Sequence, residues 1–207
     1  MRTKRPDARP LATASLETYM HRPPDLVPVE ITNNTVTEVA GRLSGGAGPG
    51  GTDSVSLQHW LLRFGAASME LRLIVSDFAE WLGNGRHSWY AYCAMMSVRM
   101  IALDKQPGAS PVGVGETWRW LMAKCVLQVT GQEAKAACGT EHLASGVKSW
   151  IEGSIHAMIL LWAHHYQEEE WGFLLIDGQN AFNEENLTEM LWSVWNEWPS
   201  GAQFNFN

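Results

Sequence analysis

The chain has 207 residues, 45% of them apolar, which is enough to bury one sizeable hydrophobic core and excludes a disordered tail. Its formal net charge of -7 counts against tight autonomous binding to nucleic acid, because neutralising phosphates requires an excess of Lys and Arg. Cys93, Cys125 and Cys138 follow no zinc or disulfide spacing, which indicates reduced thiols in an intracellular protein of the nucleus or cytoplasm that is not secreted.

Residues 1–34 begin with basic side chains and are rich in proline. They contain no apolar stretch of signal-peptide length, and nowhere does the chain have the roughly 20 apolar residues that span a bilayer. We expect residues 1–34 to form a flexible lead-in, and we expect no membrane partner.

Residues 35–97 are predicted to form a helical extension. Val36, Val39 and Leu43 mark a short amphipathic pattern, and two further helices are predicted over residues 54–64 and 66–82. The second of these helices has a broad apolar surface, which needs another layer to cover it and is formed by Met69, Leu73, Val75, Phe78 and Trp81.

A glycine-rich stretch, GGAGPGG, occupies residues 45–51 within this extension. A phosphate-binding loop of this kind would follow a strand and end in Lys-Ser or Lys-Thr, and neither condition holds here. The stretch is therefore interpreted as a linker.

Residues 98–131 are predicted to form a β-hairpin followed directly by a helix. Residues 98–103 and 111–115 favour strands, and residues 104–110 contain Asp, Pro, Gly and Ser, which are typical of a turn. The helix that follows ends near Gly131 and has apolar residues in phase at Trp118, Leu121, Met122, Cys125, Val126 and Val129.

A further helical face is predicted on residues 151–162. His164 and His165 follow it, and the acidic residues Glu168, Glu169 and Glu170 come next. These side chains suggest a metal cluster. However, adjacent residues on a helix point in different directions, so the His pair alone makes a poor site. A solvated helix end followed by an acidic loop is the favoured interpretation.

Residues 173–176, Phe-Leu-Leu-Ile, form the continuous apolar run that is typical of a strand covered on both faces. Asp177 ends this run, so its carboxylate is expected at the mouth of a cleft, where oxygen ligands suit Mg²⁺. A helix is predicted from Asn183 onward, and the apolar ending of the chain suggests a truncated reading frame.

Two blocks of this sequence resemble the reverse transcriptases of non-LTR retroelements and group II introns. The first is Asp177, Ala181, Phe182 and Asn183 after a strand, which is similar to the first catalytic block of that family. The second is ALDK, PG and PVGVGETWRWLMAK in that order, which is similar to the fingers block.

The resemblance implies a set of functional residues. Asp177 would be a catalytic metal ligand for Mg²⁺, and Phe182 would pack under the sugar of the incoming nucleotide and exclude a 2′-hydroxyl. Arg119 and Lys105 would contact its phosphates. The partners of the intact enzyme would be an RNA template, a DNA primer and deoxynucleoside triphosphates.

The sequence departs from the family where Arg is expected, because Ser110, Trp120, Leu187 and Trp195 stand at those positions. Neither Ser nor Trp replaces the charged fork of a guanidinium. An Arg codon becomes a Trp codon by one cytosine-to-thymine change, so the eleven Trp residues suggest a degenerate copy of the element.

The predicted fold class is α+β, a partial right-hand polymerase with the helical extension, the fingers hairpin and helices, and the first strand and helix of the palm in residues 98–207. The second catalytic Asp-Asp pair of the family is missing from the chain. The expected function is thus a fragment of an RNA-directed DNA polymerase that is inactive alone and binds nucleic acid weakly or not at all. The alternatives are a non-catalytic folded remnant or interaction module and, more distantly, a metallohydrolase that uses His164 or His165.

Overall fold

A computed structural model describes residues 25–104, 106, 108–139, 149–176 and 186–206. Helices dominate these residues, and the described strands form one small antiparallel sheet, which is compatible with the α+β class. In chain order the elements are α2 (Asn33–Gly41), α3 (Ser54–Leu62), α4 (Ala66–Asn84), α5 (Trp89–Tyr92), β1 (Val98–Asp104), β2 (Ala109–Gly115), α6 (Thr117–Cys138), α7 (Trp150–His165), α9 (Leu187–Glu197) and α10 (Pro199–Phe206).

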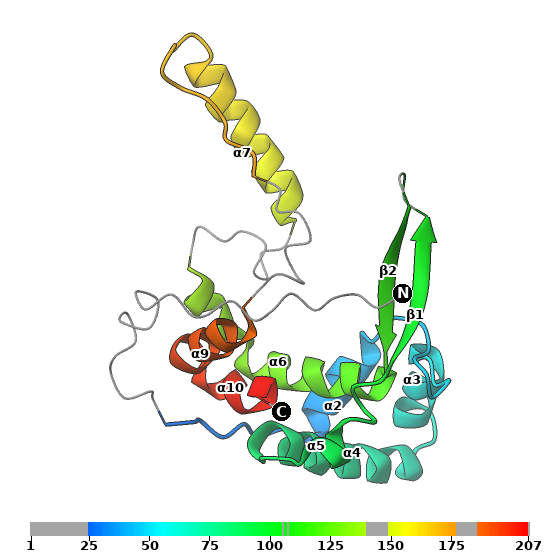
Figure 1. The fold of residues 1–207 in the computed structure, drawn as a ribbon. Helices are drawn as coiled ribbons and strands as arrows, with labels where there is room; N and C mark the ends of the chain where they lie inside the picture. Colours follow the sequence, from blue (N-terminus) through cyan, green and yellow to red (C-terminus); the bar gives the residue numbers. More distant parts are fainter. Residues whose placement is uncertain (1–24, 105, 107, 140–148, 177–185, 207) are drawn as a thin grey trace.

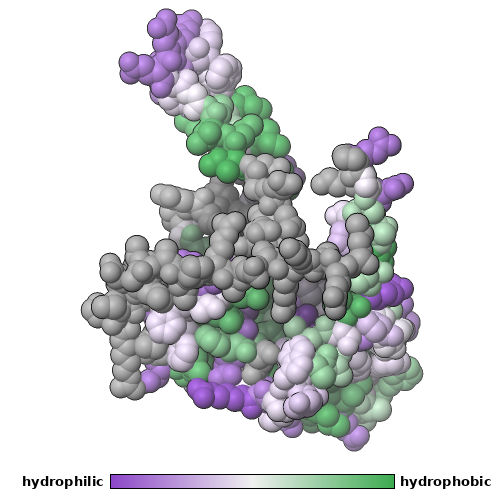
Figure 2. All heavy atoms as spheres, in the orientation of Figure 1, coloured by the Kyte–Doolittle hydropathy of each residue, from purple (hydrophilic) through white to green (hydrophobic). Residues whose placement is uncertain are grey.

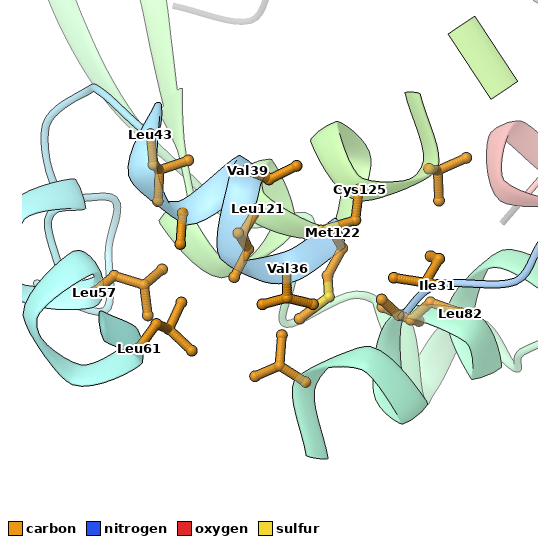
Figure 3. Packing of buried hydrophobic residues seen from close by; sticks show 14 of the residues in the cluster. Ile31, Val36, Val39, Leu43, Leu57, Leu61, Leu82, Leu121, Met122 and Cys125 are labelled. Atoms are coloured by element: carbon orange, nitrogen blue, oxygen red, sulfur yellow. The ribbon is translucent and has the colours of Figure 1, made fainter. Parts of the chain in front are cut away.

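A helical body surrounds the core, and β1, β2 and α7 project away from it (Figure 1). Within the body α2 packs against α3, α4 and α6, while α10 packs against α9, α6 and α4. Figure 3 shows side chains of α2, α3, α4 and α6 meeting around Val36. The fully buried large side chains include Leu57, Leu61, Leu82, Leu121 and Met122.

The expected flexible lead-in does not extend to the last residues before α2. Val29 and Ile31 are buried in the core. Their backbone pairs with side chains of α4: Asn84 accepts from the Val29 amide at 2.7 Å, and Glu80 accepts from the Ile31 amide at 2.6 Å. Buried backbone groups need such partners, so this segment is a fixed part of the body.

The predicted helices of the extension are confirmed, with α2, α3 and α4 beginning at a cap residue close to the expected position. Asp53 caps α3 by accepting a hydrogen bond from the Ser56 amide at 2.8 Å, and that bond lowers the pKa of the Asp53 carboxyl. α4 differs from expectation in its orientation. Val75 is buried as expected, together with Ser76, Ala79 and Leu82, whereas Met69, Leu73, Phe78 and Trp81 are exposed.

The β-hairpin is confirmed, with Val98 paired to Gly115 at its base and Asp104 to Ala109 at its tip. Gly108 takes a positive φ of 93° in the turn, a conformation that glycine adopts without strain. Every residue of β1 is exposed. The hairpin is therefore a ribbon that stands out from the body instead of forming part of a larger sheet (Figure 1).

The predicted strand at residues 173–176 is wrong. The segment belongs to no sheet among the described residues, and its side chains are in solvent, with Leu174, Leu175 and Ile176 82–84% exposed. It runs back along α7, where Phe173 stacks on Trp162 with 6.2 Å between ring centroids (Figure 1). A continuous apolar run forms a strand only where other strands supply hydrogen-bond partners.

The segment after Trp198 forms α10, which packs into the body. Ser200, Gly201, Ala202 and Gln203 are buried, and Ser200 donates a hydrogen bond to the Glu133 carboxylate of α6. A Cβ at Gly201 would lie 2.3 Å from the Trp198 ring, so only glycine permits this close approach.

Candidate functional site

Of the four residues that the resemblance assigns to nucleotide and metal, one lies in the described part of the chain. Asp177, Phe182 and Lys105 fall outside the described residues, and Arg119 lies in the first turn of α6. Among these four, only the surroundings of Arg119 can therefore be described. These surroundings lie where β2 joins α6.

The glycine-rich loop holds this junction in place. Glu116, the residue before α6, accepts a hydrogen bond from the Gly50 amide at 2.6 Å, and the Thr117 hydroxyl donates to the Thr52 carbonyl at 2.6 Å. The backbones approach so closely that a Cβ at Gly48 would lie 2.6 Å from the Gly115 carbonyl oxygen. The sequence prediction of a linker is confirmed in that residues 45–51 form a loop, and its glycines permit this contact.

The same contacts make a phosphate cradle at this loop unfavourable. A phosphate-binding loop offers free backbone amides to an anion. Here a carboxylate already accepts from the Gly50 amide, and a second anion beside Glu116 would be repelled.

Arg119 lies one helical turn inside the junction, half-buried behind the base of the hairpin. A Cβ at Gly115 would be 3.9 Å from a terminal nitrogen of the guanidinium. The Arg119 Nε is buried and has no hydrogen-bond partner among the described residues. A guanidinium carries a permanent charge and a fixed fork of donors, so the half-buried Arg119 is a candidate for binding an anion through its terminal nitrogens.

Trp120 and Trp195, which stand where the resemblance leads us to expect Arg, make contacts of their own. Trp120 is exposed, and the Lys124 ammonium lies 5.0 Å from the centre of its ring, so a cation remains near this position. Trp195 is half-buried and packs edge-on against Phe206, with 5.2 Å between ring centroids, joining α9 to α10.

A second cluster of chemically capable side chains lies at the far end of α7. One donor atom from each of His164, His165 and Glu168 lies within 4.8 Å of the others. The His165 Nδ1 and a Glu168 carboxylate oxygen are 2.8 Å apart, close enough for a hydrogen bond. The sequence suggested a metal cluster here, but a solvated helix end followed by an acidic loop was the favoured interpretation. The available signal was the spacing, because Glu168 follows the two histidines by four and three residues.

A hollow of about 360 Å³ lies between residues 27–30, α6 and the start of α10. Two carboxylates, Glu30 and Glu133, contribute to its lining, and none of its lining residues is Lys or Arg. This charge is unsuited to a nucleoside triphosphate, so the hollow is no candidate for the nucleotide site.

None of the helices in the described part of the chain combines the length and hydropathy required to cross a bilayer. A scan against protein-family models, a search of curated proteins and a search of solved structures each find no match to the chain.

Proposed function

We propose that the chain is the fingers and first palm part of a retroelement RNA-directed DNA polymerase, and that its surviving activity is binding of a nucleoside triphosphate. The observation that carries the proposal is the hairpin of β1 and β2 leading directly into α6, with Arg119 at the junction. In the family that the sequence resembles, basic side chains at this place hold the triphosphate.

The geometry of Arg119 supports a role in phosphate binding. Its guanidinium carries donors in a fixed fork that matches two phosphate oxygens, and its buried Nε has no partner among the described residues. The glycine-rich loop anchors Glu116 and Thr117, which fixes the start of α6 and with it the direction of the Arg119 side chain.

The other assignments follow from the resemblance. Asp177 would hold Mg²⁺, which would neutralise the triphosphate, while Phe182 would exclude a ribose and Lys105 would add a second cation at the hairpin turn. RNA template and DNA primer would be partners of the intact enzyme, in the nucleus or cytoplasm.

Catalysis by this chain alone is expected to be negligible. Polymerase-type phosphoryl transfer uses two metal ions about 3.5–4 Å apart, which need several neighbouring carboxylates. The sequence has no Asp-Asp pair to join Asp177. Its net charge of -7 also disfavours tight binding of template and primer.

Binding of a fluorescent deoxynucleoside triphosphate, titrated with and without Mg²⁺, tests the proposal. Arg119→Ala removes charge-assisted hydrogen bonds worth about 1.5–3 kcal/mol, so the affinity should fall about 10–150-fold. Asp177→Ala should abolish the Mg²⁺ dependence. Arg99→Ala, which removes an equal charge from the exposed face of β1, should leave binding unchanged within about twofold.

The proposal is wrong if the wild-type chain shows no Mg²⁺-dependent binding, or if Arg99→Ala weakens binding as much as Arg119→Ala. The nucleotide sequence downstream of the Asn207 codon gives an independent check. An Asp-Asp turn after one helix and hairpin would support the polymerase, whereas its absence would favour a remnant.

The exposed face of α4 favours a second candidate, a non-catalytic interaction module. Phe78 and Trp81 stack with 5.5 Å between ring centroids, and Met69 and Leu73 extend the same face. Contiguous exposed apolar side chains often mark binding surfaces. Analytical ultracentrifugation of the wild type and Phe78→Lys separates the candidates. If the chain is a module that acts through this face, the wild type should self-associate and Phe78→Lys should not. Neither protein should then bind the nucleotide.

A further inference from the structure

The end of α7 places two imidazoles and a carboxylate around one point. His164 and His165 are the last two residues of the helix, and Glu168 lies in the turn that follows. The three donor atoms lie within 4.8 Å of one another. Imidazole nitrogen and carboxylate oxygen are ligands of the kind that Zn²⁺ takes in proteins.

The backbone of this turn explains how one carboxylate can lie close to both neighbouring histidines. The chain turns after the end of the helix, and the Glu168 amide donates a hydrogen bond to the His165 carbonyl at 2.9 Å. The Glu168 side chain then reaches back to His165 and lies beside His164. The two imidazole rings tilt toward each other, with 4.5 Å between their centroids.

Aromatic side chains fix the His165 ring. Trp171 stacks on it at a centroid distance of 4.9 Å and an interplanar angle of 22°. Trp171 in turn contacts Phe173 edge-on at 4.9 Å and Trp162 at 6.3 Å. Restricting a ligand's rotamers lowers the entropy cost of coordination, so this packing prepares His165 to bind an ion.

The cluster is accessible from solvent. It lies at the tip of α7, away from the helical body, where Figure 2 shows hydrophilic atoms beyond a hydrophobic band on the helix. His164 and Glu168 are exposed, and the His165 side chain is 27% exposed. An ion can reach the site without any rearrangement of the body.

We propose that His164, His165 and Glu168 form a binding site for a divalent late transition metal, with Zn²⁺ as its ligand. Zn²⁺ bonds of about 2.0–2.2 Å in a tetrahedron place neighbouring donors about 3.3–3.6 Å apart. The donors already lie at separations from 2.8 Å to no more than 4.8 Å, so side-chain rotations alone bring them to this geometry. The ion replaces the direct contact between His165 and Glu168.

Three protein ligands leave one coordination position for water or a further ligand. Among the described residues the tip of the helix is exposed and forms no enclosed pocket around the three side chains, so the assignment is to metal binding and not to hydrolysis. Mg²⁺ is expected to bind this site poorly, because it prefers oxygen donors in octahedral geometry. The site is separate from the Arg119 junction and stands independently of the proposed nucleotide binding.

Isothermal titration of the tag-free chain with Zn²⁺, with the thiols kept reduced and excess Mg²⁺ present, tests the site. One equivalent of Zn²⁺ should bind. Because loss of even an outer-shell partner weakens metal sites by about 10–100-fold, His164→Ala, His165→Ala and Glu168→Gln should each weaken binding by at least about tenfold. Glu168→Gln retains an oxygen acceptor for His165, so it tests the carboxylate without removing the turn.

Matched controls lie on both sides of the cluster. Glu169→Gln makes the same change one residue further on, and His156→Ala removes an imidazole from the same helix, so both should bind Zn²⁺ as the wild type does. Far-UV circular dichroism should be equal for all variants. The proposal is overturned if no equivalent binds, if binding survives Glu168→Gln and His165→Ala because the thiols hold the ion, or if the controls weaken it equally.

Discussion

Cys125 is fully buried on the core face of α6, and this burial raises the pKa of its thiol from an ordinary value of 9.0 to about 12. The cause is desolvation, because the apolar core around Leu121 and Met122 cannot solvate a thiolate. Cys138 by contrast is exposed, and Cys93 is half-buried. The three thiols therefore differ in reactivity, since the thiolate is the reactive form.

We expect a thiol reagent such as Ellman's reagent to label Cys93 and Cys138 in the native protein at pH 8 and to label Cys125 only after denaturation. Counting the released thiolate before and after adding guanidinium measures this difference. Rapid labelling of all three thiols in the native state would contradict the burial of Cys125.

The same pKa shift predicts a pH dependence of stability. Below pH 9 the thiol is protonated in both states, and its contribution to the free energy of unfolding is complete. As the pH rises from 9 towards 12 the unfolded state loses the proton while the folded state keeps it, so this contribution is lost. Urea unfolding measures this effect. Above pH 9 the free energy of unfolding of the wild type should fall relative to that of Cys125→Ala, which lacks the thiol.

At the scale of elements, the segment before α2 is attached to α4 through two side chains. The Asn84 amide group both accepts from the Val29 amide and donates to its carbonyl, at 2.7 and 2.8 Å. Glu80 uses one oxygen to accept from the Ile31 amide at 2.6 Å. Because the Val29 and Ile31 side chains are buried, these bonds determine which face of the segment enters the core.

Asn84→Asp should lower the free energy of unfolding by about 1–3 kcal/mol, because the carboxylate cannot donate to the Val29 carbonyl and repels it. Glu80→Gln is the matched control, since the glutamine oxygen can still accept from Ile31 and the change should stay within about 0.5 kcal/mol. Urea unfolding at pH 7 measures both. Equal effects of the two substitutions would contradict the assigned bonds.

The elements that sequence reasoning found are those with local signals. The hairpin has turn residues at its tip, and α2 and α3 have Thr32 and Asp53 as caps. The predicted end of α6 near Gly131 was early because an isolated glycine is tolerated inside a helix. The helix ends instead at Cys138 and is followed by Gly139, whose φ of 70° suits a helix terminus.

The remaining differences depend on tertiary context that periodicity does not contain. α4 packs against α2, α3 and α6 with Val75, Ser76, Ala79 and Leu82 buried, and periodicity alone did not show which part of its apolar surface would face these helices. Residues 173–176 have the composition of a strand but no strand beside them among the described residues. The His164 cluster depends on a turn beyond the helix end, and Arg119 was selected through the family resemblance alone.

At the scale of the whole molecule, α7 and the segment beside it expose much apolar surface but contribute nothing to the buried hydrophobic cluster of the body. The buried hydrophobic cluster draws on residues 29–126, whereas α7 has no buried residue. Ile159, Leu160 and Leu161 are exposed on α7, and the apolar residues 173–176 lie beside it. Burial of apolar area is the main source of stability, so the helical body should account for nearly all of it.

Leu121→Ala in the core should lower the free energy of unfolding by about 2–5 kcal/mol. Leu160→Lys on α7 should change it by no more than about 0.5 kcal/mol while reducing the binding of a hydrophobic dye. Urea unfolding and dye fluorescence measure the two effects. A large loss of stability in Leu160→Lys would show that α7 is packed against the body in solution.

The projecting ribbon of β1 and β2 also affects how copies of the protein meet at high concentration. A two-stranded sheet has an outer edge on each strand, and the unpaired amide and carbonyl groups along such an edge can align with those of another molecule. Pro111 lacks an amide hydrogen and so interrupts the β2 side, whereas β1 contains no proline. Fibrillar association, where it occurs, should therefore begin along β1.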